Sequence, residues 1–298
     1  MENLSPIVLF TYLRLESLKQ AINALANNSL AIDSNLIIFS DGSKSKKDDS
    51  AVKEVRAYLK TIKGFKSVAI NESSSNKGLA ASIIQGVSDV LKVYPSAIIL
   101  EDDLIPSRNF LAFMNQALEY YQDKPEILAI SGFSPTIKGL HEEEVYFTHR
   151  ASSWGWACWE DRWSKIDWKC EYYHVFKHSA TLKSKFNEMG SDMSLMMKRQ
   201  MEGELNSWAI RFCFHQFQHQ LFSVHPAISK IQNIGLSDEL ATNTYQKYIR
   251  YSSTLDQSCI NSFVFQNQIL LNPKVIKQFI KDKSISVRII NKLLNLFK

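Results

Sequence analysis

The sequence predicts an α/β fold in which a mostly parallel, Rossmann-like sheet is flanked by helices. Two observations lead to this prediction. Short apolar segments alternate with segments of helical periodicity between residues 6 and 130, and such alternation is typical of parallel sheets covered on both faces. Polar residues also follow the apolar segments, at the strand ends where α/β proteins bind ligands. With 298 residues, 45% of them hydrophobic, the chain can bury a substantial core.

The expected elements follow one another in a regular order. Strands are expected over residues 6–11, 36–40, 67–70, 97–100 and 127–130, each a short apolar run. Helices are expected over residues 15–26, 48–62, 78–93 and 109–121, where apolar residues recur at helical spacing. In the first helix, Leu18, Ile22 and Leu25 share one face.

The pattern changes after residue 145, where aromatic residues concentrate. All six tryptophans fall within the 55 residues from Trp154 to Trp208. This concentration suits a groove that stacks on sugar rings, and an aromatic core is the alternative. For the helix-spaced Trp156, Trp159 and Trp163 we expect core packing.

Charge and composition exclude several classes of protein. The net charge is +5, but residues 274–298 carry seven basic residues and one acidic residue, a balance of +6, so residues 1–273 total −1. A nucleic-acid-binding body is therefore not supported. No apolar run approaches the ~18 residues needed to cross a bilayer, and the N-terminus lacks the features of a signal peptide, so a cytoplasmic location is expected. Cys158, Cys170, Cys213 and Cys259 form no CxxC pair and are expected to be reduced, mostly buried thiols.

The main candidate for chemistry is an acidic triplet, Glu101, Asp102 and Asp103, at the end of the strand at 97–100. Adjacent carboxylates at the mouth of a buried strand repel one another unless a cation or hydrogen-bond donors offset their charge. Mn²⁺ or Mg²⁺ shared with a diphosphate would do so, because these ions prefer hard oxygen ligands and keep exchangeable waters. The alternative is an ordinary acidic turn or a helix cap.

Other polar residues follow neighbouring strands. Asp41 could accept a hydrogen bond from a nucleobase imide, although Asp-Gly is also a common turn. Asn76, Lys77 and Gly78 begin a helix and form either an anion site or a solvated helix start. Arg14 could pair with phosphate or lie on a solvated helix face. The chain lacks GxGxxG and GxxxxGK[ST], which argues against a dinucleotide-binding dehydrogenase and a P-loop ATPase.

In their order and separations, four segments resemble glycosyltransferases of the GT-A fold: SPIVLFTYLR, IIFSDGS, NKGLAASIIQGV and AIILEDDLIPSRNFLAFMNQAL. The resemblance is closest to the N-acetylglucosaminyltransferase I type and its bacterial relatives in polysaccharide synthesis. It covers residues 5–245, and the later segments WGWACW and IQNIG are consistent with it. It implies inverting, metal-dependent transfer of a sugar from a nucleotide sugar, UDP-linked by preference, to a hydroxyl of a glycan or lipid-linked saccharide.

The resemblance also implies roles for individual residues. It gives Asp103 the metal, Asp102 the ribose and Glu101 a contact with the donor sugar. The other donor-site residues that it implies are Thr11, Arg14, Asp41, Asn76, Lys77 and Gly78. Residues 1–135 would form the nucleotide-sugar-binding half of one domain, residues 136–272 its acceptor-side half with Trp154 and Trp208, and residues 273–298 a basic tail.

The catalytic base is where the sequence departs from the family. The family places a carboxylate just before a tryptophan at the start of a helix, but here Asn206 and Ser207 precede Trp208. Neither residue can serve as a base. Glu204 is the nearest acid and the expected base, with Asp161 as the second candidate. A helix-capping or solvated role is the alternative for both.

The tail from Val275 to Lys298 is expected to form one basic amphipathic helix. Such a helix can lie on an anionic membrane surface, here the inner face, or it packs on the domain or mediates a dimer. His215, His219 and His225 lie close together, but without an HExxH context we expect packing or hydrogen-bonding roles.

Two other functions remain open at this stage. A sugar nucleotidyltransferase also uses acids at a sheet edge, but it usually needs a glycine-rich loop, and Pro6 to Leu15 contains no glycine. An inactive carbohydrate-binding or scaffold protein is the other alternative, suggested by Asn206 and Ser207 where the base should be.

Overall fold

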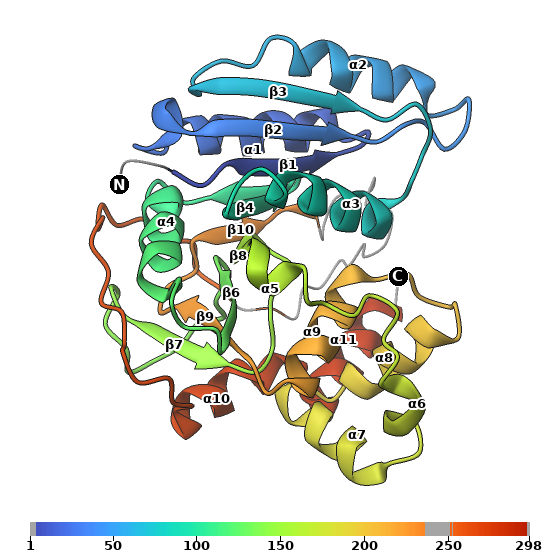
Figure 1. The fold of residues 1–298 in the computed structure, drawn as a ribbon, viewed down its shortest axis with the longest axis vertical. Helices are drawn as coiled ribbons and strands as arrows, with labels where there is room; N and C mark the ends of the chain where they lie inside the picture. The colour runs from blue at the N-terminus through green and yellow to red at the C-terminus, as the bar shows by residue number, and fades with distance from the viewer. Residues whose placement is uncertain (1–3, 236–250, 252, 297–298) are drawn as a thin grey trace.

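A computed structural model describes residues 4–235, 251 and 253–296 of the chain (Figure 1). Its strands are β1 (Ile7–Thr11), β2 (Asn35–Ser40), β3 (Ser67–Glu72), β4 (Ser96–Glu101), β5 (Leu104–Pro106), β6 (Ile127–Ser131), β7 (Val145–Thr148), β8 (Trp156–Trp159), β9 (Phe222–Pro226) and β10 (Ile231–Asn233). Its helices are α1 (Leu15–Ala26), α2 (Asp49–Leu59), α3 (Leu79–Leu91), α4 (Phe110–Tyr121), α5 (Glu160–Trp163), α6 (Tyr173–Phe176), α7 (Ala180–Phe186), α8 (Met193–Met201), α9 (Trp208–Gln218), α10 (Pro273–Phe279) and α11 (Ile285–Leu296). Short 3₁₀ turns lie at Ala31–Asp33, Asn187–Met189 and Lys281–Lys283.

One eight-stranded sheet runs through the molecule in the order β3-β2-β1-β4-β8-β6-β9-β7. Strands β1 to β4 are parallel, and β8 is antiparallel to both β4 and β6. The order 3-2-1-4 is that of a Rossmann-like half. All strands and helices expected between residues 6 and 130 are present, within a few residues of the expected bounds. The predicted α/β class with a mostly parallel sheet is therefore confirmed.

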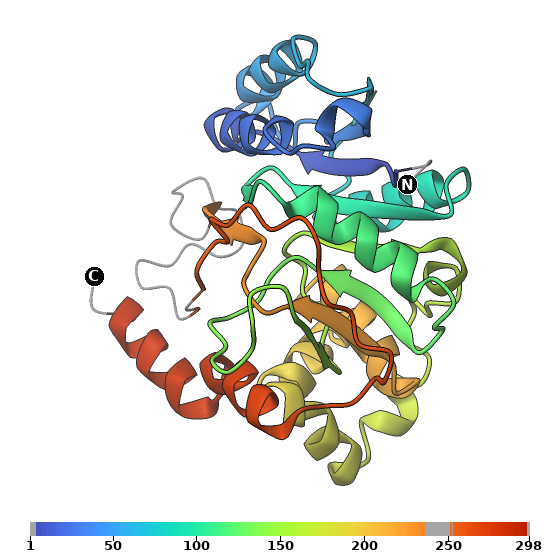
Figure 2. The same cartoon turned by 90° about the vertical axis from the view of Figure 1, so that its left-hand side faces the viewer.

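Helices cover both faces of this sheet, because alternate strand residues point to opposite sides. In β1, Ile7 and Leu9 pack with the apolar faces of α1, α2 and α4. Val8 and Phe10 point the other way and pack with α3, α5 and α9. A separate apolar cluster joins α6 to α9 in the lower part of the molecule (Figure 2). The C-terminal ends of β1, β2 and β4 thus reach one edge of the sheet on a rigid support.

The tryptophan-rich segment is buried, as predicted for three of its members. Trp156, Trp159 and Trp163 are 2%, 5% and 3% exposed. The helical spacing assumed for them is wrong, since Trp156 and Trp159 are the two ends of strand β8 and Trp163 ends the short helix α5. The strand is covered on both faces, so its residues are buried without alternation.

The C-terminal tail is two helices, which corrects the prediction of one continuous helix. Asn272 caps α10, whose first residue is Pro273. Lys283 Nζ then donates to Phe279 O, at the end of that helix, at 2.7 Å. Ser284 Oγ accepts from Val287 N and begins α11. Lys298, the expected end of the tail, lies outside the described residues. Within residues 4–235 and 253–296, no helix is long and apolar enough to cross a bilayer.

Candidate functional site

The polar residues that follow β1, β2 and β4 meet at one edge of the sheet. Thr11 pairs with Ser40 across β1 and β2, and Phe10 pairs with Glu101 across β1 and β4. Asp41 directly follows β2, and Asp102 and Asp103 directly follow β4. Because parallel strands end on the same side, this edge is where ligands bind in such sheets.

The acidic pair is held by a network that begins in β1. Arg14 Nη2 lies 2.5 Å from Asp102 Oδ1, and Arg14 Nη1 lies 2.8 Å from Asp103 Oδ2. Thr11 Oγ1 and Tyr12 N both donate to Asp102 Oδ2, at 2.9 and 3.2 Å. Asp102 is 3% exposed and both of its oxygens have partners. Asp102 and Thr11 therefore fix the position of the site in this structure.

Burial and mutual repulsion act on the protonation of these groups. Burial raises the pKa of Asp102, and attraction to Arg14 opposes that rise. The pKa of Glu101 is raised to about 8 by burial and by repulsion from Asp103 and Asp102. Burial lowers the pKa of Arg14, but the pull of the two aspartates outweighs it and the net change is upward. Arg14 thus stays cationic and neutralises much of the acidic edge.

Asp103 differs from Asp102 in having an oxygen to spare. Its side chain is 12% exposed, and within the described part of the chain Oδ1 has no hydrogen-bond partner. Gly235, just after β10, lies so close that a Cβ there would stand 1.9 Å from Asp103 Oδ2 and 2.7 Å from Arg14 Nη1. Ile234 N also donates to Asp103 O at 3.0 Å. The IQNIG segment therefore covers the ion pair, and a larger residue at position 235 would have to displace the Asp103 or Arg14 side chain.

Asp41 joins two loops at the same edge. Its Oδ1 accepts from Gly42 N and Lys77 N, and its Oδ2 accepts from Gly78 N, each at 2.9 Å. Asn76 Nδ2 donates to Gly42 O at 2.9 Å. Gly78 has φ +74°, a left-handed conformation that glycine adopts without strain. The structure brings all of these predicted residues together and shows Asp41 holding the loops, while the Lys77 side chain is exposed.

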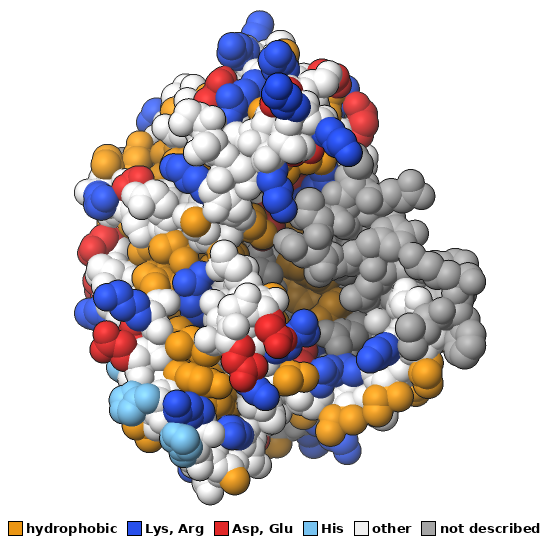
Figure 3. Space-filling view, turned by 90° about the vertical axis from the view of Figure 1, so that its right-hand side faces the viewer, with side chains coloured by type: hydrophobic (Ala, Val, Ile, Leu, Met, Phe, Trp, Pro, Cys, Tyr) orange, Lys and Arg blue, Asp and Glu red, His pale blue; other side chains and the backbone are white. Residues whose placement is uncertain are grey.

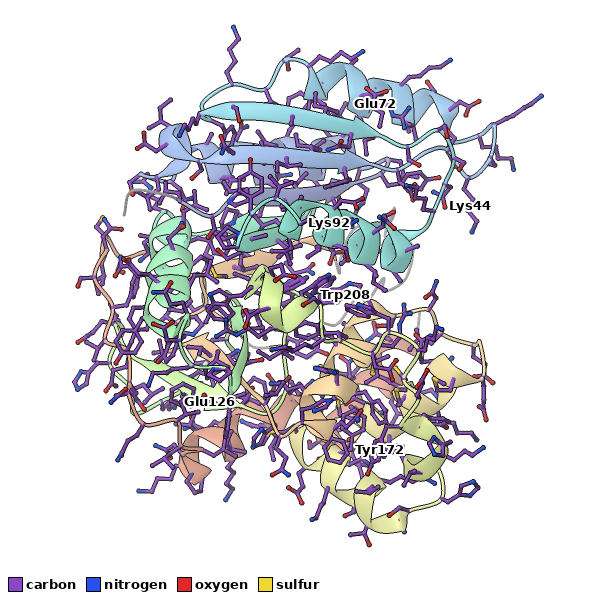
Figure 4. The ribbon with its side chains drawn as sticks, in the orientation of Figure 1. Lys44, Glu72, Lys92, Glu126, Tyr172 and Trp208 are labelled. Atoms are coloured by element: carbon purple, nitrogen blue, oxygen red, sulfur yellow. The ribbon has the colours of Figure 1, made fainter. Side chains whose placement is uncertain are left out.

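Arg56 is a residue of this edge that the sequence analysis missed. From the last turn of α2 it donates to Ser40 O, Asp41 O and Ser73 O at 3.5, 3.3 and 2.7 Å, and it pairs with Glu72 at 3.3 Å. Figure 4 shows Glu72 at the end of the sheet toward which β2 and β3 point. In the sequence, Arg56 could have been noticed as a single arginine next to Val55, on the otherwise apolar face of α2.

A cavity of about 220 Å³ opens beside these loops. It lies between the end of β2, the end of β3 and the first turns of α3, and its lining includes Phe39, Asp41, Glu72, Lys77 and Gln85. Phe39 supplies an aromatic ring, while three carboxylates, from Asp41, Glu72 and Asp89, outnumber the single Lys77, so the cavity suits a polar flat ring that carries hydrogen-bond donors rather than an anionic group.

The acidic edge supplies few ligands for a metal ion. Among the described residues, no three His, Cys, Asp or Glu side chains are grouped so that they could hold a metal ion. Of the two aspartates, Asp103 has an oxygen to offer, Oδ1, since Asp102 is fully engaged. The neighbouring Glu101 is the other possible ligand, but its pKa of about 8 favours the neutral acid, which is a weak metal ligand. Mg²⁺ and Mn²⁺ are commonly held by one or two carboxylates together with substrate phosphates and waters. The residues therefore fit an ion that arrives with a diphosphate rather than a resident metal.

The two tryptophans expected on the acceptor side lie in different surroundings. Trp154 is half-buried, and its ring meets Phe133 and Tyr251 edge-on at 4.5 and 5.2 Å. Trp208 is 4% exposed and stacks on Trp156 at 4.7 Å, in the interior between α5 and α9 (Figure 4). Trp208 thus has no free ring face for a sugar, because its indole fills the aromatic core.

The structure places Asp161 away from the acidic edge and shows Glu204 on the surface. Asp161 follows β8, whose end pairs with the start of β4, so it lies about five residues or 17 Å along the strand from the triplet. Glu204 is exposed and pairs with Arg199 at 3.2 Å. Ser207 caps α9 by accepting from Ile210 N, and the exposed Asn206 accepts from Arg211. Position 207, where the family has its carboxylate, therefore has a capping role in this chain.

Two of the three histidines are buried as predicted, whereas His219 is exposed and contacts the His215 ring. His215 and His225 are 5% and 0% exposed, and burial lowers the pKa of each to about 4. His225 hydrogen-bonds within the core, with Nδ1 2.9 Å from Phe133 O. All four cysteines are free thiols, and all but Cys259 are buried.

No family profile matches the sequence, and no curated protein sequence matches it. Similar solved structures include a mannosyltransferase from Pyrobaculum calidifontis in complex with GDP-Man and Mn²⁺, at 12% identity and a TM-score of 0.37, with 52% of this chain and 45% of that chain covered. S. aureus TarS 1–349 is 10% identical with a TM-score of 0.43, covering 79% and 61%. Mouse xyloside xylosyltransferase 1 in its apo form is 11% identical with a TM-score of 0.37, covering 72% and 82%. The chain thus spans less than two thirds of the first two structures. Likenesses at this level assign no activity to it.

Proposed function

We propose that the chain is a glycosyltransferase of the GT-A fold that binds a nucleotide sugar at the acidic edge of its sheet. The observation that carries the proposal is the arrangement around Asp103. A buried network of Thr11, Arg14 and Asp102 holds this aspartate, and one of its oxygens is left for a cation. The cavity beside Asp41 lies at the same edge, next to the strand that carries Thr11 and Arg14.

The residues divide the work of binding between them. The nucleoside would enter the cavity beside Phe39 and Asp41, with the diphosphate toward Asp103. Lys77 and the exposed Lys44 supply positive charge there (Figure 4). Asp103 would hold Mn²⁺ or Mg²⁺, which when bound neutralises charge on the departing diphosphate. Arg14 keeps Asp102 and Asp103 in place and offsets their repulsion.

The finer features of the proposal rest on the resemblance to the N-acetylglucosaminyltransferase I type. They are inversion at the transferred sugar, a preference for UDP-linked donors, and a glycan or lipid-linked saccharide as acceptor in surface polysaccharide synthesis. We propose a cytoplasmic enzyme that works at the inner face of the membrane. Residues 1–135 would bind the donor, and residues 136–272, including Trp154, would receive the acceptor.

Isothermal titration of nucleotide sugars with and without Mn²⁺ tests the donor site. We expect binding of a UDP-sugar that depends on Mn²⁺, and no measurable binding of Mn²⁺ alone, because Asp103 has one free oxygen and Arg14 offsets the charge of both aspartates. Asp103→Ala should abolish the Mn²⁺-dependent part and leave the fold intact. The control Asp123→Ala changes an exposed acid that follows α4 and should bind as the wild type does. Unchanged donor affinity in Asp103→Ala would count against the proposal.

Product analysis separates the alternatives. A transferase should slowly release nucleoside diphosphate from the donor without any acceptor, whereas a nucleotidyltransferase would form pyrophosphate. A binding protein would do neither, and the position of Asp161 and the capping role of Ser207 give that alternative its support. If Glu204 is the base, Glu204→Gln should lower turnover by a factor of ~10²–10⁴ without changing donor affinity. Normal turnover in this variant would exclude Glu204.

A further inference from the structure

Helix α11 presents its apolar side to solvent. Ile285, Ile289 and Leu293 follow one another at i, i+4 and i+8, and they are 63%, 55% and 49% exposed. Ile290 and Leu294 form the neighbouring row and are 56% and 46% exposed. Since residues four apart lie above one another on a helix, these five side chains form one continuous face. We call them the α11 face.

The opposite side of α11 is fixed to the body of the protein. Arg288 Nη1 donates to Ser191 Oγ at 3.0 Å. Ser191 in turn donates through its backbone N and its Oγ to Lys283 O at 3.2 and 2.8 Å. Val275 and Phe279 of α10 pack with Tyr146 in an apolar cluster of their own. These contacts hold the tail so that the α11 face points outward.

The tail that carries the α11 face is rich in positive charge. Between residues 273 and 296 there are six basic residues and one acid, which gives +5. The exposed lysines among them are Lys274, Lys277, Lys281 and Lys292. Figure 3 shows a row of hydrophobic side chains along the lower right edge of the molecule, with Lys and Arg side chains beside it.

We propose that the α11 face docks in the plane of an anionic lipid bilayer. The face contains only aliphatic side chains and is bordered by lysines. Protein–protein interfaces are enriched in aromatic residues and arginine and depleted in lysine, whereas membrane-surface helices combine an apolar face with a lysine-rich polar one. Twelve residues span about 18 Å, too short to cross a bilayer, so the helix lies parallel to the surface.

The orientation of the protein on the bilayer determines how an acceptor could reach the site. This part of the inference rests on the proposed function. In Figures 1 and 2, α11 lies on the side of the molecule toward which β1 points. The acidic edge at Asp103 would then open toward the bilayer. A saccharide linked to a lipid carrier would reach it without leaving the membrane.

Vesicle co-sedimentation of the full chain tests the docking separately from any transferase activity. We expect binding to vesicles of phosphatidylcholine mixed with phosphatidylglycerol, and little binding to pure phosphatidylcholine. The double variant Ile289→Glu/Leu293→Glu should partition about tenfold less or weaker still, because it places charge in the apolar interface. The control Val93→Glu changes a side chain that is 75% exposed on the body and should bind as the wild type does.

A second variant tests the role of charge. Lys281→Glu/Lys292→Glu should weaken binding to the anionic vesicles by about fivefold or more for each lysine. All these side chains are exposed, so thermal melting of the variants should match the wild type. Two results would overturn the proposal. One is wild-type binding by Ile289→Glu/Leu293→Glu, and the other is a wild-type dimer in analytical ultracentrifugation that this variant dissociates. Loss of donor binding in Asp103→Ala with intact vesicle binding would leave the docking inference standing by itself.

Discussion

Two arginine–aspartate pairs with little solvent exposure, one at the acidic edge and one in the helical region, have different surroundings. Arg14 bridges Asp102 and Asp103 at the C-terminal ends of parallel strands, beside a cavity and loops that are rich in polar groups. Arg150 Nη1 pairs with Asp192 Oδ1 at 3.0 Å in the helical region and also donates to Met189 O at 3.1 Å. The second pair fastens α8 to the loop after β7. A buried ion pair thus indicates a site only when the topology also places it at a ligand-binding edge.

Replacing the arginine of each pair tests this comparison and should give the largest change in the stability of the fold. Arg14→Met and Arg150→Met should each destabilise the fold by about 3–5 kcal/mol, because each leaves buried carboxylate charge uncompensated. Only Arg14→Met should also abolish Mn²⁺-dependent donor binding, because only Arg14 positions Asp103. Urea unfolding and calorimetry measure the two quantities. Equal loss of donor affinity per folded molecule in both variants would show that the two regions are not separable.

Substitution of two tryptophans, Trp208 and Trp154, compares a core position with a candidate acceptor position within the aromatic region. Trp208→Ala should destabilise the protein by about 3–5 kcal/mol, since it empties a stacked core position. Trp154→Ala removes edge-on contacts of a half-buried ring and should cost about 1 kcal/mol. If Trp154 receives the acceptor, its variant alone should raise the acceptor KM at constant donor affinity. A raised acceptor KM in a folded Trp208 variant would contradict the core assignment.

The fold of the N-terminal half could be predicted because its local signals agree with one another. Each strand from β1 to β4 is an apolar run, and each is followed by a helix with one apolar face. The aromatic half gave weaker signals, since Trp156 and Trp159 have a spacing that suits a helix and a strand alike. Periodicity does not separate short apolar runs of the two kinds. The break in the tail was not predicted because it depends on single side-chain hydrogen bonds. Lys283 makes one at the end of α10, and Ser284 makes one at the start of α11.

The candidate site was predictable in place but not in detail. Strand order alone brings Thr11, Asp41 and Asp103 to one edge. Which aspartate stays accessible depends on Arg14, whose two ion pairs join residues nearly ninety positions apart. The same limit applies to Arg56, which reaches backbone carbonyls that no sequence pattern reveals.

Gly235→Ala tests the close approach at the acidic edge. The added Cβ must displace Asp103 or Arg14, and the ion pair between them leaves neither side chain free to move. We expect donor affinity in the presence of Mn²⁺ to fall about tenfold, or ~1.4 kcal/mol. Gln232→Ala, an exposed change on the same strand β10, should have no effect. Calorimetry with the same donor compares the two, and full affinity in Gly235→Ala would show that the edge is more adaptable than the geometry indicates.

The last expected effect appears only at acidic pH and concerns His215, which contributes to the pH dependence of the helical region. Burial, together with repulsion from the nearby His219, lowers its pKa from 6.5 to about 4, and Asp167 opposes the shift. In the unfolded chain the imidazole takes up a proton as the pH falls through 6.5, whereas in the fold it does so only near 4. The contribution to stability is therefore complete above pH 6.5 and is lost as the pH falls to about 4.

His215→Phe should remove this loss and flatten the pH dependence of the unfolding free energy between these values by about one proton, or 1.36 kcal/mol per pH unit. The exposed His174→Phe should leave the slope unchanged, and donor binding should be the same in both variants, because His215 is remote from the acidic edge in sequence and packs among aromatic residues of α9. Unfolding by urea at several pH values measures the slope, and an unchanged slope in His215→Phe would mean that this histidine is not held neutral by its burial.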